Sequence, residues 1–217
     1  MKEMKSQAEC ITNAINELEK FAVEVENLRT ILANKVNHIL DGNGHWKVDK
    51  IEECSYVNNL QCFYKWHSIC LPLLEPREHK PKHHLNYQIS YAGESVAIPG
   101  MVHRPLVHVL FWTYEICENN FFAYPLKIED YFGKKKKRQG RFGLKDSSLI
   151  VLYYDNDKPY WQYSVDLLSV TSATMDELLI NPARELIENG IESWQVKQGS
   201  ALDKAIVRYE DVSSFSE

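Results

Sequence analysis

The sequence predicts an α+β protein with a long N-terminal amphipathic helix, then a mostly antiparallel β-sheet of about six to seven strands, then a C-terminal helix. Three observations support this fold class. Apolar residues recur every seven positions near the N-terminus, period-two alternation with short turns begins at Trp46, and helical spacing returns near Thr174. Because the strands follow one another without helices between them, a doubly wound parallel sheet is disfavoured.

The N-terminal helix is expected at residues 6–40. Ser6 and Glu9 form a capping box at its start, and the glycines of segment 41–44 end it. Lys35 interrupts the apolar seam, and a second apolar row beside the seam also suits a helix docked on its own domain. Pairing with a second copy, pairing with another protein and intramolecular docking are therefore three open alternatives. The seam residues that we assign to oligomerisation are Ile11, Leu18, Phe21, Val25, Leu28, Leu32 and Ile39.

The chain length favours one folded domain with a helical appendage. The chain has 217 residues, of which 44% are hydrophobic and 12% are aromatic, which is enough for one core but not for two equal domains. We therefore expect a coiled-coil-like helix at residues 1–43, which forms a homodimer or binds a partner protein, and an α+β domain at residues 44–217.

The first extended segments should form a β-hairpin. Residues 46–57 and 60–71 flank Asn58-Asn59, which is a two-residue turn signal. Apolar and polar residues then alternate in residues 85–91, so one face of this strand should be buried and the other exposed to water.

The centre of the sheet is expected later in the chain. Residues 106–117 are apolar on both faces, as in a central strand. Residues 149–154 and 160–168 should form a second hairpin around the turn-forming segment 155–159. The aromatic residues of this hairpin are expected to be buried as cross-strand pairs rather than exposed as a platform for nucleic-acid bases.

The C-terminal part should return to helix. Residues 174–177 have the spacing of a capping box, and residues 181–182 place Asn before Pro, which is the pattern of a new helix start. Gly190 is expected to end or bend this helix. Residues 205–209 are expected to form an edge strand.

The strongest sign of function is a basic, glycine-containing loop at residues 133–147. It holds six positive charges in the eight residues 134–141, and glycine and arginine both favour contact with phosphate oxygens. A second basic cluster at residues 77–84 forms the other wall of the same site if both lie at one end of the sheet. The alternative is a solvated loop that pairs with this chain's own acidic C-terminal third. The residues that we assign to nucleic-acid or phosphate binding are Lys134, Lys135, Lys136, Lys137, Arg138, Arg141, Arg77, Lys80, Lys82 and His84.

The charges are unevenly distributed along the chain. The net charge is −5, with five Lys/Arg against seven Asp/Glu in residues 1–44 and four against ten in residues 166–217. The middle of the chain, residues 45–165, therefore has a balance of +3. This asymmetry favours a local anion-binding surface over a protein that coats nucleic acid with its whole surface.

Other features restrict the cell compartment and the chemistry. No apolar run approaches the ~18–20 residues that span a bilayer, and the start of the chain lacks an apolar signal region, so a cytoplasmic location is expected. The five cysteines include no CxxC pair and are expected to be reduced thiols. His79 and His83 have a spacing that binds metal on a helix, but Pro81 argues against a helix there, and no metal is expected.

Recognisable catalytic motifs are absent from the sequence. It has no Walker loop, GxGxxG, GxSxG or HExxH, and we expect no cofactor. His108 lies in an apolar strand and is expected to be a hydrogen-bonded core histidine. Paired with Glu115 or Asp166, it could instead act as a general base.

Three functional hypotheses follow from these patterns. The leading one is a non-catalytic, self-associating binding module that presents its basic loops to a polyanion, either a nucleic acid or a phosphate ligand, or to an acidic protein surface. The second is an enzyme that acts on phosphodiesters or nucleotides through a His–carboxylate pair. The third is a pure protein–protein inhibitor or adaptor that uses the acidic C-terminal third.

Overall fold

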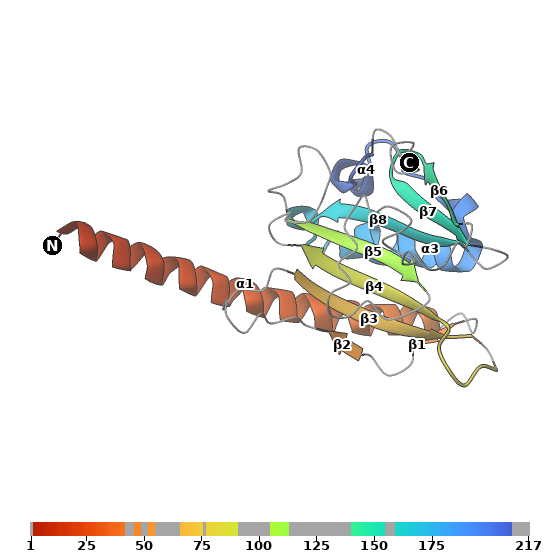
Figure 1. The fold of residues 1–217 in the computed structure, drawn as a ribbon, viewed down its shortest axis with the longest axis horizontal. Coiled ribbons are helices and arrows are strands. Elements are labelled where there is room, and N and C mark those ends of the chain that lie inside the picture. Colours follow the sequence, from red (N-terminus) through yellow and green to blue (C-terminus); the bar gives the residue numbers. More distant parts are fainter. Residues whose placement is uncertain are drawn as a thin grey trace.

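The fold is an antiparallel β-sheet with helices packed against it (Figure 1). This arrangement confirms the predicted α+β class and the antiparallel sheet. The structure, a computed structural model, describes residues 2–41, 46–48, 52–54, 66–75, 77–90, 105–112, 140–154 and 159–209.

The sheet has eight strands in the order β1-β3-β4-β5-β8-β7-β6, and β2 also pairs with β3. The expected strand at residues 46–57 is instead two short strands that both pair with β3, which raises the strand number above the predicted six to seven. The Asn58-Asn59 turn lies outside the described residues. The strands are β1 (Lys47–Val48), β2 (Glu52–Cys54), β3 (Trp66–Leu74), β4 (His83–Ser90), β5 (Leu106–Trp112), β6 (Gly140–Lys145), β7 (Leu149–Tyr154) and β8 (Tyr160–Asp166).

One face of the sheet forms the main hydrophobic core. A row of fully buried side chains crosses four adjacent strands on this face: Ile69, Tyr87, Val109 and Tyr163. Period-two alternation places such residues on one face, as the pattern of residues 85–91 predicts. The prediction that the opposite face of this strand is wet is wrong, because Asn86 and Gln88 on that face are also fully buried.

The basic loop is shorter than the sequence suggests. Residues 140–145 form strand β6, so Arg141 and Gly143 lie in a strand rather than in the predicted loop at 133–147. β6 supplies a partner along the second edge of the apolar strand β7. Asp146 and Ser147, with φ of 50° and 53°, close the tight turn between them.

Among the described side chains of the N-terminal helix, those that pack on the domain belong to its last part. Helix α1 (Lys2–Asp41) begins before Ser6, so the predicted capping box does not mark its start. Leu32, Ala33 and Val36 are buried in the core. The described side chains between Thr12 and Asn27 are all exposed, and Figure 1 shows this part of the helix projecting from the domain.

An ion pair accounts for the presence of Lys35 in the otherwise apolar seam of α1. Lys35 Nζ lies 2.6 Å from a carboxylate oxygen of Asp176, which begins a turn of π-helix, η2 (Asp176–Ile180). On the sheet side, the Tyr163 hydroxyl donates to the carbonyls of Leu178 and Leu179 at 3.2 and 3.1 Å. The π-turn is therefore held between the sheet and α1.

The C-terminal helices differ in detail from the prediction. The 174–177 capping box does not form, because the Thr174 hydroxyl donates to Ser169 O and Glu177 accepts the Ala201 N–H. A new helix begins at 181–182 and ends at Gly190, where φ is 79°, as predicted, but Asn181 is itself helical and no side chain caps this start. The elements are η1 (Leu167–Ser169), η2, α3 (Asn181–Asn189), η3 (Ile191–Ser193) and α4 (Ala201–Ala205).

The expected edge strand at residues 205–209 is reduced to a single bridge. Ile206 pairs with Val165, and the Val207 N–H donates to Ser164 O. β7 pairs only with the first half of β8, so the second half of that edge is available to this segment.

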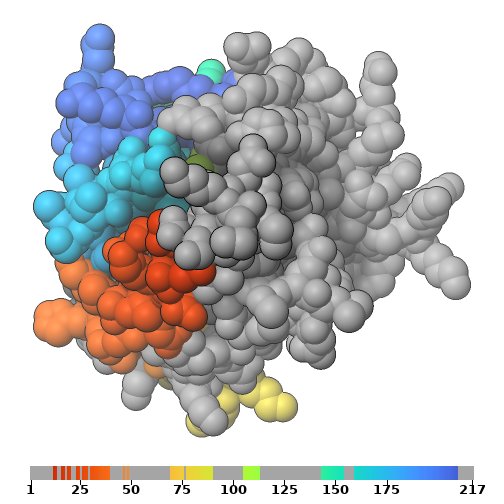
Figure 2. Space-filling view, turned by 90° about the vertical axis from the view of Figure 1, so that its left-hand side faces the viewer, coloured from red at the N-terminus to blue at the C-terminus, as the bar shows by residue number. Residues whose placement is uncertain are grey.

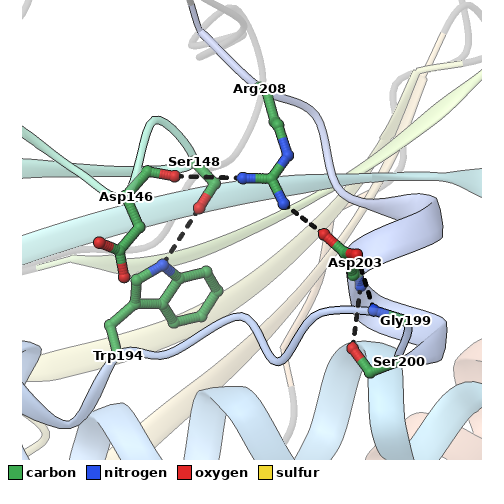
Figure 3. Close-up of polar contacts among 7 residues, drawn as sticks. All are labelled: Asp146, Ser148, Trp194, Gly199, Ser200, Asp203 and Arg208. Atoms are coloured by element: carbon green, nitrogen blue, oxygen red, sulfur yellow. Dashed lines mark hydrogen bonds and ion pairs between the residues drawn. The ribbon is translucent and has the colours of Figure 1, made fainter.

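A cluster of polar contacts fixes the C-terminal segment to the β6–β7 turn (Figure 3). Arg208 forms an ion pair with Asp203 and donates to the carbonyl oxygen of Asp146. The indole of Trp194 donates to the Ser148 hydroxyl at 3.1 Å. These contacts hold the last described residues against the sheet.

Candidate functional site

Two basic segments of the sequence meet one end of the sheet. The connection 75–82 joins β3 to β4, which begins at His83. His84 pairs with Trp112, the last residue of β5, and the ring of Trp112 lies 4.8 Å from that of Tyr160, the first residue of β8. The connection and these strand ends therefore lie at the same end of the sheet.

The first residues of β6 lie at this end as well. Leu152 of β7 pairs with Tyr160, and Gly140 pairs with Tyr154, the last residue of β7. The basic run 134–138 ends two residues before Gly140 and lies outside the described residues. We call the connection 75–82 together with Gly140 and Arg141 the basic end of the sheet.

The described cations of the basic end differ in whether they already form an ion pair within the protein. Arg77 and Lys80 are exposed, and neither has an ion pair within the part of the chain that the structure describes. Lys82 forms an ion pair with Glu78, whose hydrogen bond and charge raise the pKa of Lys82. Arg77 has a φ of 75°, in a turn where the Glu78 N–H donates to Glu75 O. Arg77 and Lys80 are thus the cations most open to a ligand.

The sequence assigns His84 to the second basic cluster, at residues 77–84, but this residue is part of the sheet. It lies within β4, half-buried, between Pro72 and Trp112 of the neighbouring strands. His83 is also in β4, where its ring stacks on Phe111 at a centroid distance of 5.0 Å. Both histidines are therefore part of the sheet, with β4 beginning where the sequence predicted a loop.

The two walls of the basic end are well separated. β4 and β6 are four strand spacings apart in the sheet order, which corresponds to roughly 19 Å at about 4.8 Å per strand. An extended polyanion spans this distance with a different phosphate at each wall.

A buried polar cluster lies on the face of the sheet opposite the main core. His108 Nδ1 and Ser164 Oγ are 2.7 Å apart, and the Tyr209 hydroxyl donates to the same Ser164 oxygen at 3.1 Å. Because Tyr209 is the donor in that bond, the Ser164 proton is available to His108 Nδ1. Burial lowers the pKa of His108 to about 4, so the imidazole is neutral at neutral pH.

The polar cluster extends to β4 through Gln88, which pairs with His108 in the sheet register. The side-chain amide of Gln88 is fully buried, and neither its nitrogen nor its oxygen has a hydrogen-bond partner within the described chain. The sequence does not predict this cluster as a unit, because the alternation in β4 predicts that its polar residues face solvent.

Within the described residues, His108 is hydrogen-bonded to a hydroxyl, as expected of a core histidine, and not to a carboxylate of the kind that the enzyme hypothesis requires. The Asp166 carboxylate accepts the N–H of Leu168 at 3.0 Å and so caps η1. Glu115 and His103 lie outside the described residues.

A groove lies between α1 and the segment that contains η1. Its volume is about 380 Å³, and its walls include Leu28 and Ile31 from α1 and Leu168, Val170 and Met175 from the other side. Figure 2 views the molecule from the side toward which α1 projects and shows the two walls side by side.

The predicted oligomerisation residues fall into two groups. Leu32 is buried in the core of its own domain, and Leu28 and Ile39 pack against it. These three positions are therefore occupied by intramolecular docking, one of the three alternatives that the sequence left open. The side chains of Ile11, Leu18, Phe21 and Val25 lie outside the described residues.

Other sequence-based candidates are placed as follows. Tyr160, Trp161 and Tyr163 of the second hairpin are buried, as predicted, whereas Tyr153 is half-buried and the side chain of Tyr154 lies outside the described residues. Cys70 of β3 is fully buried. Within the described ranges, no group of three or more His, Cys, Asp or Glu side chains has an arrangement that could hold a metal ion.

Comparisons with protein-family models, with curated proteins and with solved structures give no match for this chain. Among the described residues, no helix combines the length and the apolar character needed to cross a bilayer.

Proposed function

We propose that this protein is a non-catalytic, self-associating module that binds a polyanion, most simply a nucleic acid, at the basic end of the sheet. The observation that supports this proposal is the register of the strands. It brings the connection 75–82 and the start of β6 to one end of the sheet, although they are almost sixty residues apart in the sequence.

The separation of the two walls favours a polymer over a small anion. Lys80 and Arg77 are exposed at one wall, and the chain that enters the other wall has five consecutive cations at residues 134–138. Each phosphate that such cations neutralise releases counterions, so affinity depends steeply on salt. No enzyme chemistry is needed to explain this arrangement.

Binding to a nucleic-acid duplex across a salt series tests the proposal. We expect the affinity of the native chain to fall steeply between about 50 and 200 mM salt, with a log–log slope of roughly −0.9 per phosphate contact. Changing Lys134, Lys135, Lys136 and Lys137 to Glu should reduce both the affinity and the slope.

A matched pair of double variants locates the surface. Arg77→Glu with Lys80→Glu should weaken binding by at least about tenfold. Lys197→Glu with Lys204→Glu makes the same charge change at two exposed positions away from the basic end and should leave the slope unchanged. Salt-insensitive or undetectable binding of the native chain to both duplex and single strand would contradict the proposal.

A further inference from the structure

We propose that the groove beside α1 receives the projecting N-terminal half of α1 from a second copy of this chain, so that two copies exchange these helices reciprocally. This inference rests on the self-association in the proposed function, and it names the surfaces that produce it. The polyanion surface plays no part in the contact.

The exposed apolar residues of the molecule point to this surface. Within the described ranges, the large hydrophobic side chains that remain exposed are Val23 at 61%, Ile31 at 39% and Leu168 at 75%. Ile31 and Leu168 line the two walls of the groove. Val23 lies eight residues before Ile31, about 80° around the helix from it, and is not part of the groove. Clustered exposed apolar residues of this kind mark an interaction site.

The chain itself contains a helix that fits such a groove. Residues 2–27 of α1 precede the docked part, and the described side chains from Thr12 to Asn27 are exposed. The sequence of this half nevertheless has an apolar stripe at heptad spacing, with Ile11, Leu18 and Val25 in one row. A helix gains most of its stability from burying such a stripe against a partner surface.

The domain prevents two copies from pairing their apolar seams along the whole length of α1. From Leu28 onward, the seam residues are already packed against the chain's own core. A parallel coiled coil of two copies would therefore end near Leu28 and leave both grooves open. If the helices run antiparallel instead, the projecting half of each copy reaches the groove of the other, and both apolar surfaces are covered.

The groove is short compared with the projecting half of α1. Its wall on α1 runs from Glu24 to Ile31, about 11 Å or two turns at 1.5 Å per residue, whereas residues 2–27 span about 39 Å. In the exchange the groove therefore receives about two turns of the incoming helix, and the rest of that helix lies along α1 of the other copy.

A complementation experiment tests the exchange. Leu168→Glu damages the groove at an exposed position and leaves the helix intact, whereas Leu18→Glu damages the projecting helix and leaves the groove intact. Molar mass is measured by light scattering over a concentration series, and folding is checked by circular dichroism. The control is Gln198→Glu, which adds the same charge at an exposed position outside the groove.

We expect the native chain and the control to be dimers, and each groove or helix variant alone to dissociate at least about a hundredfold more readily. Mixing the two variants should restore part of the dimer, because one of its two contacts then joins the intact helix of the Leu168→Glu chain to the intact groove of the Leu18→Glu chain. A native chain that is monomeric throughout would overturn the inference. So would a Leu168→Glu chain that dimerises like the native one, since that result indicates direct seam pairing. Either of these two results concerns the dimer alone, and the salt series with the native chain tests duplex binding independently.

Discussion

His108 links the sheet to the C-terminal segment through a chain of buried polar groups. Its imidazole contacts Ser164, and the same hydroxyl accepts the Tyr209 proton. A buried imidazole that accepts a hydrogen bond must stay neutral, because a protonated ring would be both desolvated and deprived of an acceptor site. The stability of this part of the protein is therefore coupled to pH.

Protonation of His108 should destabilise the fold in mildly acidic solution. Burial lowers its pKa from 6.5 to about 4, so the unfolded chain binds the proton first as the pH falls. The contribution of the neutral imidazole to the free energy of unfolding is fully present above about pH 6.5. It is lost progressively down to about pH 4, with a total on the order of 3 kcal/mol. Urea unfolding at a series of pH values measures this dependence.

The matched control for this prediction is His108→Gln. Carboxylates titrate in both proteins over part of the same range, so the difference between the two pH profiles isolates the imidazole. If the free energy of unfolding changes equally in both proteins between pH 7 and pH 4, His108 does not titrate as described.

At the level of single residues, the sequence predicts the role of a side chain better than it predicts which groups surround that side chain. The position of His108 in an apolar strand is enough to predict that it is a hydrogen-bonded core residue. The alternation in β4 shows that Asn86 and Gln88 share a face, but periodicity contains no information about what covers that face. Their burial, and the meeting of His108 with Ser164 from 56 residues away, could not be predicted from local pattern.

Among the elements, α1 shows that a heptad pattern can serve docking within one chain. The seven-residue spacing that begins at Ile11 includes Leu32, which is buried in the domain core. Lys35 interrupts the seam because its ammonium group pairs with Asp176, 141 residues further along the chain. A heptad pattern therefore predicts that a face is buried, but it does not identify the partner.

Truncating the docked part of α1 should cost far more stability than truncating the projecting part. Leu32→Ala leaves a cavity in the core and should lower the free energy of unfolding by about 2–5 kcal/mol. Val23→Ala, at an exposed position on the same helix, should change it by less than about 0.5 kcal/mol. Denaturant unfolding at low protein concentration measures both, and equal effects would show that the domain does not depend on this docking.

The sheet was predictable in its antiparallel character but not in its order. Short turns between strands such as β7 and β8 indicate local pairing. The placement of β8 between β5 and β7, and the addition of β6 beyond β7, depend on contacts between distant segments. The length of the basic loop was overestimated because its positive charges concealed a strand: Arg141 and Lys145 lie in β6, whose pairing with β7 is made by backbone groups.

For the whole molecule, the two proposed surfaces have a joint consequence. An exchanged dimer holds two basic ends on one particle, separated by a distance comparable to the length of α1. A helix of 40 residues is about 60 Å long, which about 18 base pairs of duplex span at 3.4 Å each. A long duplex can then contact both ends at once, and the second contact is strengthened by the high local concentration.

The native chain should therefore prefer long duplexes more than a monomeric variant does. We expect about tenfold or greater tightening when the duplex is lengthened from about 10 to about 40 base pairs, beyond the statistical gain in sites. Leu168→Glu, which leaves the basic end unchanged, should lose this preference but keep its affinity for the short duplex, as measured by fluorescence anisotropy. Gln198→Glu should behave like the native chain. If the Leu168→Glu chain is monomeric but keeps the full length preference, the two basic ends do not act together, and polyanion binding is a property of each domain alone.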